Sequence, residues 1–181
     1  TDAKKKGCVF MLEIYCGNGK GKTTAAMGLA FRALGRGKNV YILQFLKGDN
    51  SRELEAFAAF PQAMVAENPK QMKFLFQMTP EEKELCRQDC IRRFQEASVC
   101  IRSQHPFVVV MDELLDAIEC GLVPEDEVLE LISQCKGDCE FVLTGRRYSP
   151  AMEAQADYIT RMEKVKHPYD QGAAPRAGIE F

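Results

Sequence analysis

A glycine-rich stretch at residues 15–24, YCGNGKGKTT, contains residue types that could bind phosphate. The usual phosphate-binding loop has the pattern G-x-x-x-x-G-K-[ST]. Here Cys16 stands at the position of the first glycine, and only three residues separate Gly17 from Gly21. A glycine backbone can curl so that its N–H groups point toward an anion, and a helix that follows adds a favourable dipole. The stretch therefore predicts a nucleotide site with a shortened phosphate loop.

The loop residues are the predicted phosphate ligands, and two of them are also predicted to act in catalysis. Lys22 would neutralise phosphate charge, and the Thr23 hydroxyl would ligate Mg²⁺ or Mn²⁺. The stretch follows an apolar run and precedes a helix-like sequence, which is the context that the motif requires. The alternative is a glycine-rich turn without a ligand. The predicted set is Gly17, Asn18, Gly19, Lys20, Gly21, Lys22, Thr23 and Thr24.

Two acidic residues end a second apolar run, VVVMDE at residues 108–113. An acid at the end of a buried strand supports the metal ion in nucleotide-binding sheets. Asp112 and Glu113 are therefore candidate metal ligands, either direct or through water, and Glu113 is the third predicted catalytic residue. The alternative is that one of these acids caps the helix that follows.

Two arginines are further candidates for nucleotide contact. Arg32 lies ten residues after Lys22, and Arg146 ends the run LTGR at residues 143–146. Open α/β sheets place ligand contacts beyond the carboxyl ends of their strands, which favours a phosphate contact for Arg146. The alternatives are a solvated helix face for Arg32 and a surface ion pair for Arg146.

The elements that would position these residues alternate between strand and helix. Such alternation predicts an α/β fold, here a P-loop nucleotide-binding fold with a mostly parallel central sheet flanked by helices. Thr79 followed by Pro80 is a clear helix start. The expected strands are 8–15, 39–46, 63–67, 106–113, 140–145 and 158–165, and the expected helices are 22–37, 51–60, 79–104, 114–120, 125–135 and one that opens at 149–150.

Length and composition predict one globular domain over residues 1–181, with a net charge of −2 that indicates neither nucleic acid nor membrane as a partner. Residues 1–7 are expected to form a leader, 47–78 a lid or binding loop, and 166–181 a C-terminal tail. The eight cysteines read as reduced thiols of a cytoplasmic protein, because no secretory signal accompanies them.

The sequence offers no evident general base beside the loop. A kinase needs a group that takes a hydroxyl proton, and an ATPase needs a residue that orients water, a role open to Glu113. The alternative is a nucleophile that has no proton to lose, so that the site needs only positioning and charge stabilisation.

Five segments resemble the ATP:corrinoid adenosyltransferases of the cob(I)alamin type. They are GNGKGKTTAA, GRGKNVYILQFLKG, VVVMDE, VLTGR and VKHPYDQG with GIEF, and the similarity extends from about Val9 to Phe181. The resemblance implies a RecA-like, six-stranded fold and a homodimer. It also implies transfer of the 5′-deoxyadenosyl group of ATP to the Co(I) of a reduced corrinoid, with release of triphosphate, and a flavoprotein reductase as electron donor.

The resemblance also assigns roles to residues. It implies that the loop holds the triphosphate as a leaving group, that Arg32 lies near the ribose, and that Glu113 is the metal-binding acid. Corrinoid contact is implied for Phe74 and Phe76, which stand where the family often has a phenylalanine–tryptophan pair, and for Lys166 and His167 of the tail. The alternatives are ordinary core phenylalanines and a structural corner in the tail.

Two other functions are consistent with a phosphate loop. The first alternative is a RecA-like ATP hydrolase, but no basic face suggests a polymer substrate. The second is a nucleotide-dependent switch of the partitioning-ATPase type, which would have a lysine where this chain has Gly17.

Overall fold

The protein is described by a computed structural model over residues 9–48, 52–172 and 174–179. A six-stranded sheet lies at its centre, all its neighbours are parallel, and its order is β3-β2-β4-β5-β1-β6. This confirms the α/β, RecA-like prediction. The strands are β1 (Leu12–Cys16), β2 (Val40–Gln44), β3 (Ala63–Val65), β4 (Val108–Asp112), β5 (Glu140–Thr144) and β6 (Tyr158–Arg161).

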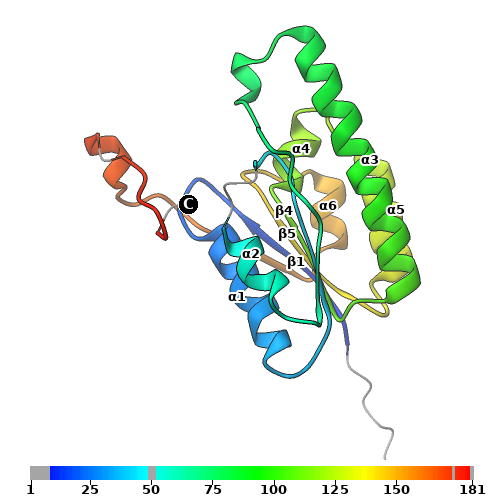
Figure 1. The fold of residues 1–181 in the computed structure, drawn as a ribbon. Coiled ribbons are helices and arrows are strands. Elements are labelled where there is room, and N and C mark those ends of the chain that lie inside the picture. The colour runs from blue at the N-terminus through cyan, green and yellow to red at the C-terminus, as the bar shows by residue number, and fades with distance from the viewer. Residues whose placement is uncertain (1–8, 49–51, 173, 180–181) are drawn as a thin grey trace, which may run out of the picture.

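Helices cover both faces of the sheet (Figure 1). One face packs against α1 and α2, and the opposite face packs against a larger apolar cluster to which the other helices contribute. The helices are α1 (Lys22–Leu34), α2 (Glu53–Ala58), α3 (Pro80–Gln104), α4 (Leu114–Glu119), α5 (Glu125–Cys135) and α6 (Pro150–Gln155), with short 3₁₀ helices η1 (Leu75–Gln77) and η2 (Pro168–Gln171).

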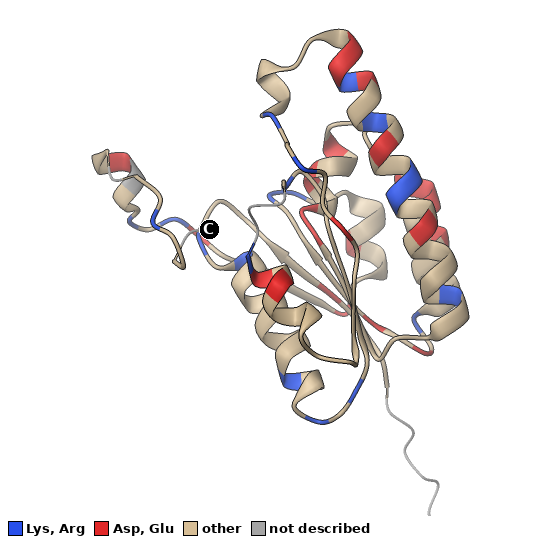
Figure 2. Cartoon of the chain, in the orientation of Figure 1, with Lys and Arg blue, Asp and Glu red and all other residues tan. Residues whose placement is uncertain are grey.

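The central strands are apolar because both of their faces are covered. Every residue of β2 and of β4 is buried, as expected for parallel strands between two helical layers. α3 is the longest helix and carries charged side chains of both signs along its outer surface (Figure 2). It begins with a capping box, in which the Thr79 hydroxyl accepts from the Glu82 N–H while the Glu82 carboxylate accepts from the Thr79 N–H.

Several element ends differ from the sequence-based expectation. β6 stops at Arg161 rather than at residue 165, because its partner β1 ends at Cys16, opposite Arg161, where the phosphate loop begins. α1 stops at Leu34 rather than at residue 37, since Gly35 follows it. β1 begins at Leu12, and the predicted leader lies outside the described residues.

Within the described residues, no helix is long and apolar enough to cross a membrane. The cysteines in the same part of the chain are free thiols.

Candidate active site

The predicted site residues gather where neighbouring strands reach their carboxyl ends. Gln44 at the end of β2 pairs with Asp112 at the end of β4, and Tyr15 of β1 pairs with Thr144 at the end of β5. The phosphate loop follows β1 directly and therefore starts at this edge of the sheet. This is the edge at which open α/β sheets bind ligands.

Glycines shape the phosphate loop by letting it approach the backbone after β6. Gly17 and Gly21 have φ values of 106° and 115°, which side chains other than glycine rarely adopt. A Cβ on Gly17 would lie 2.3 Å from the carbonyl oxygen of Met162, and one on Gly19 would lie 2.8 Å from the same atom. Gly17 is therefore required by close packing and by backbone conformation, Gly19 by close packing, and Gly21 by backbone conformation.

Part of the loop backbone is hydrogen-bonded within the protein. The Gly17 N–H donates to the Arg146 carbonyl at 3.1 Å, and the Gly19 N–H donates to the Met162 carbonyl at 2.8 Å. The Asn18 side-chain oxygen accepts from the Lys164 N–H at 2.9 Å. These bonds hold the loop in shape, so the N–H groups that remain for phosphate are those nearer the start of α1.

The N-terminus of α1 is suited to an anion. Its N-cap is Gly21, and no side chain caps the helix. The Ala25 N–H makes a helical bond to the Gly21 carbonyl at 2.8 Å, so the N–H groups of Lys22, Thr23 and Thr24 belong to the open first turn. The Lys22 ammonium donates to the Gly19 carbonyl at 2.9 Å and thus lies over the loop. Such a cradle favours phosphate.

The carboxylate of Asp112 is the polar centre of the site. It is fully buried and accepts from the hydroxyls of Thr23, at 2.9 Å, and Thr144, at 2.7 Å. It also accepts from the Gln44 amide at 3.1 Å and from the Lys47 ammonium at 2.7 Å. The loop threonine and the strand-end acid, both candidate metal ligands from the sequence, are therefore in direct contact with each other.

Lys47 is a site residue that sequence reasoning missed. Its ammonium lies 2.7 Å from Asp112 and 3.3 Å from the Thr23 hydroxyl. Burial alone would lower the pKa of Lys47, but the charge of Asp112 and the bond to it leave that pKa above its ordinary value. The available signal was its place directly after a buried strand, in the segment QFLKG.

Glu113 occupies a strained position between β4 and α4. Its φ is 57°, and its N–H donates to the Thr144 hydroxyl at 2.8 Å. Its backbone forms the N-cap of α4, yet its side chain makes no capping bond, so the capping alternative does not explain the carboxylate. Burial raises the pKa of Glu113 to about 7, although the nearby charge of Lys47 opposes this. A cation beside this carboxylate would relieve the penalty of burying its charge.

The two predicted arginines lie in different places. Arg146 is exposed after β5, its N–H donates to the Asp116 carboxylate at 3.1 Å, and its charge acts on Glu113. Arg32 lies in the last turn of α1, about 15 Å along the helix from Lys22, and its charge acts on Tyr15. Arg146 is therefore beside the site, while contact between Arg32 and a nucleotide would require the ligand to extend along α1.

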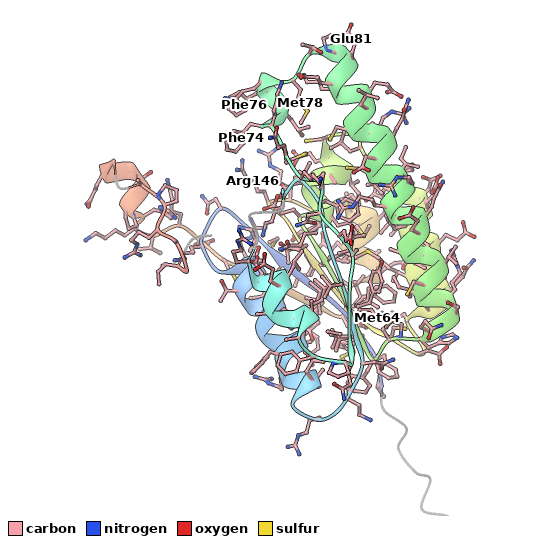
Figure 3. The ribbon with its side chains drawn as sticks, in the orientation of Figure 1. Met64, Phe74, Phe76, Met78, Glu81 and Arg146 are labelled. Carbon is pink, nitrogen blue, oxygen red and sulfur yellow. The ribbon has the colours of Figure 1, made fainter. Side chains whose placement is uncertain are left out.

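Phe74 and Phe76 form an exposed aromatic pair. Their rings stack with centroids 5.5 Å apart and planes at 16°, and the side chains are 69% and 81% exposed. Figure 3 shows both on the segment that leads into α3. A cavity of about 560 Å³ lies beside Phe76 and is also lined by Lys83, Arg87 and Leu122 among others. The pair is not part of the core, which removes the alternative of ordinary core phenylalanines.

The tail residues lie apart from this aromatic pair. Lys166 is exposed and His167 is half-buried, just before η2. Figure 1 shows the C-terminal segment extending away from the sheet, separate from the segment that precedes α3. Its closest described tie to the site is the bond between Lys164 and Asn18 of the loop. Within one chain, the structure does not bring the two predicted sets of corrinoid residues together.

Comparison with known proteins decides the family. The sequence model of the family "ATP:corrinoid adenosyltransferase BtuR/CobO/CobP" matches residues 8–181 of this chain. The chain belongs to this family. A corrinoid adenosyltransferase of Pseudomonas aeruginosa is 33% identical over 172 residues, which cover 94% of this chain and 83% of the relative. The corrinoid adenosyltransferase CobA of Salmonella typhimurium is 31% identical, with 93% and 84% covered.

Family membership agrees with the resemblance that the motifs suggested. The family is one of enzymes that transfer the adenosyl group of ATP to a corrinoid, and the shortened phosphate loop, Asp112 and Glu113 lie within the matched residues. An adenosyltransferase does not need a general base to activate its nucleophile, since a metal-centred nucleophile carries no proton.

Proposed function

We propose that this protein transfers the 5′-deoxyadenosyl group of ATP to the Co(I) of a reduced corrinoid and releases triphosphate. The observation that carries the proposal is the phosphate loop in a chain of the adenosyltransferase family: Lys22 lies over the loop at the uncapped N-terminus of α1, and Thr23 contacts the strand-end acid Asp112. The proposed phosphate ligands are the loop residues 20–24 and Arg146, with Arg32 near the ribose, while Gly17, Asn18 and Gly19, which are bonded within the protein, shape the loop.

In the proposed reaction the Co(I) lone pair attacks C5′ of ATP, and the C5′–O bond breaks. The bonding electrons leave with the triphosphate, and the cobalt becomes an alkyl-Co(III) centre. No proton moves, so the protein needs to stabilise only the charge that develops on the departing oxygen. The Lys22 ammonium and the N–H groups that open α1 are the proposed donors for this task, supported by their position at the loop.

The residues beside the loop fit a divalent cation. Thr23, Asp112 and Glu113 supply a hydroxyl and two carboxylates, which are oxygen donors that Mg²⁺ or Mn²⁺ accepts. Such an ion typically takes one or two carboxylates and completes its shell with substrate phosphates and water. When bound, it would offset negative charge on the triphosphate. Asp112 is already saturated by protein donors, so Glu113 is the better placed of the two acids.

The aromatic pair is the proposed contact for the corrin ring. Exposed, stacked phenylalanines offer an apolar surface to a flat macrocycle, and their burial under it would be favourable. Within the predicted lid, α2 packs on the sheet and β3 belongs to it, whereas the described residues 66–78 form no regular structure apart from η1. The proposed lid is therefore reduced from residues 47–78 to residues 66–78. Lys166 and His167 are proposed as further contacts from the tail.

One assay tests the proposed reaction. The protein is incubated without oxygen with ATP, Mg²⁺ and chemically reduced cobalamin, and the phosphate products are separated. Triphosphate and a light-sensitive alkylcobalt product in equal amounts are expected. Formation of ADP and orthophosphate regardless of cobalamin would instead identify an ATP hydrolase.

The resemblance further suggests a homodimer and a flavoprotein reductase as the source of Co(I), and we propose both. Light scattering on the purified protein tests the first. Replacement of the chemical reductant by a flavoprotein and its reduced nicotinamide substrate tests the second.

A further inference from the structure

A continuous line of side-chain hydrogen bonds joins α3 to the phosphate loop. The Arg93 guanidinium donates to the Asn68 side-chain oxygen at 3.0 Å. The Asn68 amide donates to the Gln44 oxygen at 3.0 Å, and the Gln44 amide donates to Asp112 at 3.1 Å. Asp112 in turn accepts from the Thr23 hydroxyl. The line thus crosses from the start of the proposed lid, over the end of β2, to the loop that follows β1.

The direction of this line is determined by its two ends. A guanidinium can only donate hydrogen bonds, and an ionised carboxylate can only accept them. Asn68 and Gln44 must therefore each present oxygen toward Arg93 and nitrogen toward Asp112. Bonds that are all polarised in one direction strengthen one another, particularly away from water. Gln44 is fully buried, and Arg93 is 6% exposed.

Asn68 is hydrogen-bonded both to the chain around the end of β2 and to α3. Its amide also donates to the Gly48 carbonyl at 3.2 Å, directly after Lys47. Arg93 also donates to the Glu67 carbonyl at 2.9 Å, which fixes the chain just before Asn68. A few residues beyond Asn68 the same segment carries Phe74 and Phe76. Movement of the carboxylate of Asp112 would therefore be transmitted to the base of this segment.

We propose that Asn68 and Gln44 are positioning residues that couple the nucleotide site to the aromatic lid, so that Mg-ATP and a corrinoid each strengthen the binding of the other. The inference rests on the proposed function, because it takes the corrinoid as the ligand of Phe74 and Phe76. Asn68 contacts neither substrate in this scheme and acts through Gln44 and Asp112.

The experiment measures coupling without turnover. Mg-ATP is titrated by calorimetry into the protein, with and without saturating cob(II)alamin, which cannot attack carbon as Co(I) does. In the wild type, cob(II)alamin should raise the affinity for Mg-ATP about fivefold or more. Asn68→Leu should reduce this factor to less than about twofold, while the affinity for Mg-ATP alone changes by less than about threefold.

Two further variants guard against a folding defect. Asn68→Asp preserves the side-chain volume and the bond to Arg93 but places an acceptor opposite the Gln44 oxygen, so it should also remove the coupling. Gln44→Met combined with Asn68→Leu should lose no more coupling than Asn68→Leu alone, because both act through one line. Thermal unfolding establishes that each variant is folded.

Asn39→Leu is the matched control. Asn39 is another half-buried amide, which accepts from the Phe107 N–H at 3.1 Å at the opposite edge of the sheet. Asn39→Leu should keep the coupling factor of the wild type. A loss of coupling in Asn39→Leu as large as that in Asn68→Leu would overturn the inference. Unchanged coupling in Asn68→Leu and Asn68→Asp, or independent binding of the two ligands to the wild type, would also overturn it while alkylcobalt formation still held. A wild type that forms no alkylcobalt product would refute the proposed function itself.

Discussion

Asp112 brings four side-chain donors together around one buried carboxylate. Two are threonine hydroxyls, one is the Gln44 amide, and the fourth is the Lys47 ammonium, which supplies the only full positive charge among these four. A buried carboxylate that loses its charged partner retains the cost of desolvation. At the scale of single residues, Lys47 therefore contributes to stability as well as to the charge of the site.

Replacement of Lys47 by methionine tests this role. Lys47→Met keeps the unbranched stem of the side chain but removes its ammonium, which leaves Asp112 without a cation, so the free energy of unfolding should fall by about 3 kcal/mol in urea titrations without nucleotide. Lys70→Met, at an exposed lysine, should change it by less than about 0.5 kcal/mol. Equal losses in the two variants would contradict the ion pair's contribution.

Lys22→Ala should abolish transfer. In the proposed reaction the ammonium over the loop would stabilise charge on the leaving triphosphate, and loss of one such donor typically costs a hundredfold or more in rate, about 3 kcal/mol. Alkylcobalt formation under saturating substrates measures the effect. Arg36→Ala, at an exposed residue after α1, is the control and should keep the wild-type rate. A Lys22→Ala rate above a tenth of the wild type would argue against this role.

At the scale of elements, the segment between β3 and α3 presents its aromatic pair to solvent. Phe76→Ala should lower transfer at limiting corrinoid about tenfold or more, because the ring offers apolar area to the macrocycle. Mg-ATP affinity, measured by calorimetry, should stay unchanged. Phe31→Ala removes another exposed ring, from the end of α1, and should affect neither quantity. An equal loss of ATP binding and corrinoid use in Phe76→Ala would exclude the lid assignment.

The elements themselves were largely predictable from sequence. Buried parallel strands have continuous apolar runs, and Thr79 with Pro80 located the start of α3. The end of β6 was less predictable, since an edge strand stops where its partner stops and not where its own pattern ends.

The residues of the candidate site were predictable only where they belong to a motif. The loop, Asp112 and Glu113 stand at recognisable positions after strands. Gln44 and Asn68 are ordinary amides in sequence, and their role depends on contacts 24 residues apart, between the end of β2 and the irregular segment. Nothing in local spacing encodes such a contact.

At the scale of the whole molecule, buried carboxyl groups make stability depend on pH. Burial raises the pKa of Glu113 to about 7 and that of Glu140 to about 7, from an ordinary value of 4.5. The folded protein therefore holds these protons more tightly than the unfolded chain, so the stability present below pH 4.5 is lost as the pH rises through 7. In the presence of a metal chelator, the free energy of unfolding should fall as the pH is raised from 5 to 8.

Substitution of each glutamate shows how much of this pH-dependent loss of stability comes from Glu113 and how much from Glu140. Glu113→Gln should remove about 3 kcal/mol of the decline, because glutamine has no charge to bury, and Glu140→Gln should remove a further part. Urea titrations at the two pH values measure both. A decline of equal size in the wild type and in Glu113→Gln would show that Glu113 is already ionised at low pH.

The phosphate loop packs on the backbone of Met162, so nucleotide binding to the loop should change how easily a protease cleaves the chain near Met162. Trypsin cuts after lysine and arginine. The exposed Arg161, Lys164 and Lys166 flank Met162 in sequence, and the Met162 carbonyl accepts the hydrogen bond from the Gly19 N–H. A nucleotide that stiffens the loop should therefore slow cleavage at these bonds, which fragment masses over time would reveal. Conversely, a chain already clipped there should bind Mg-ATP more weakly, although the cut lies more than a hundred residues from the loop in sequence.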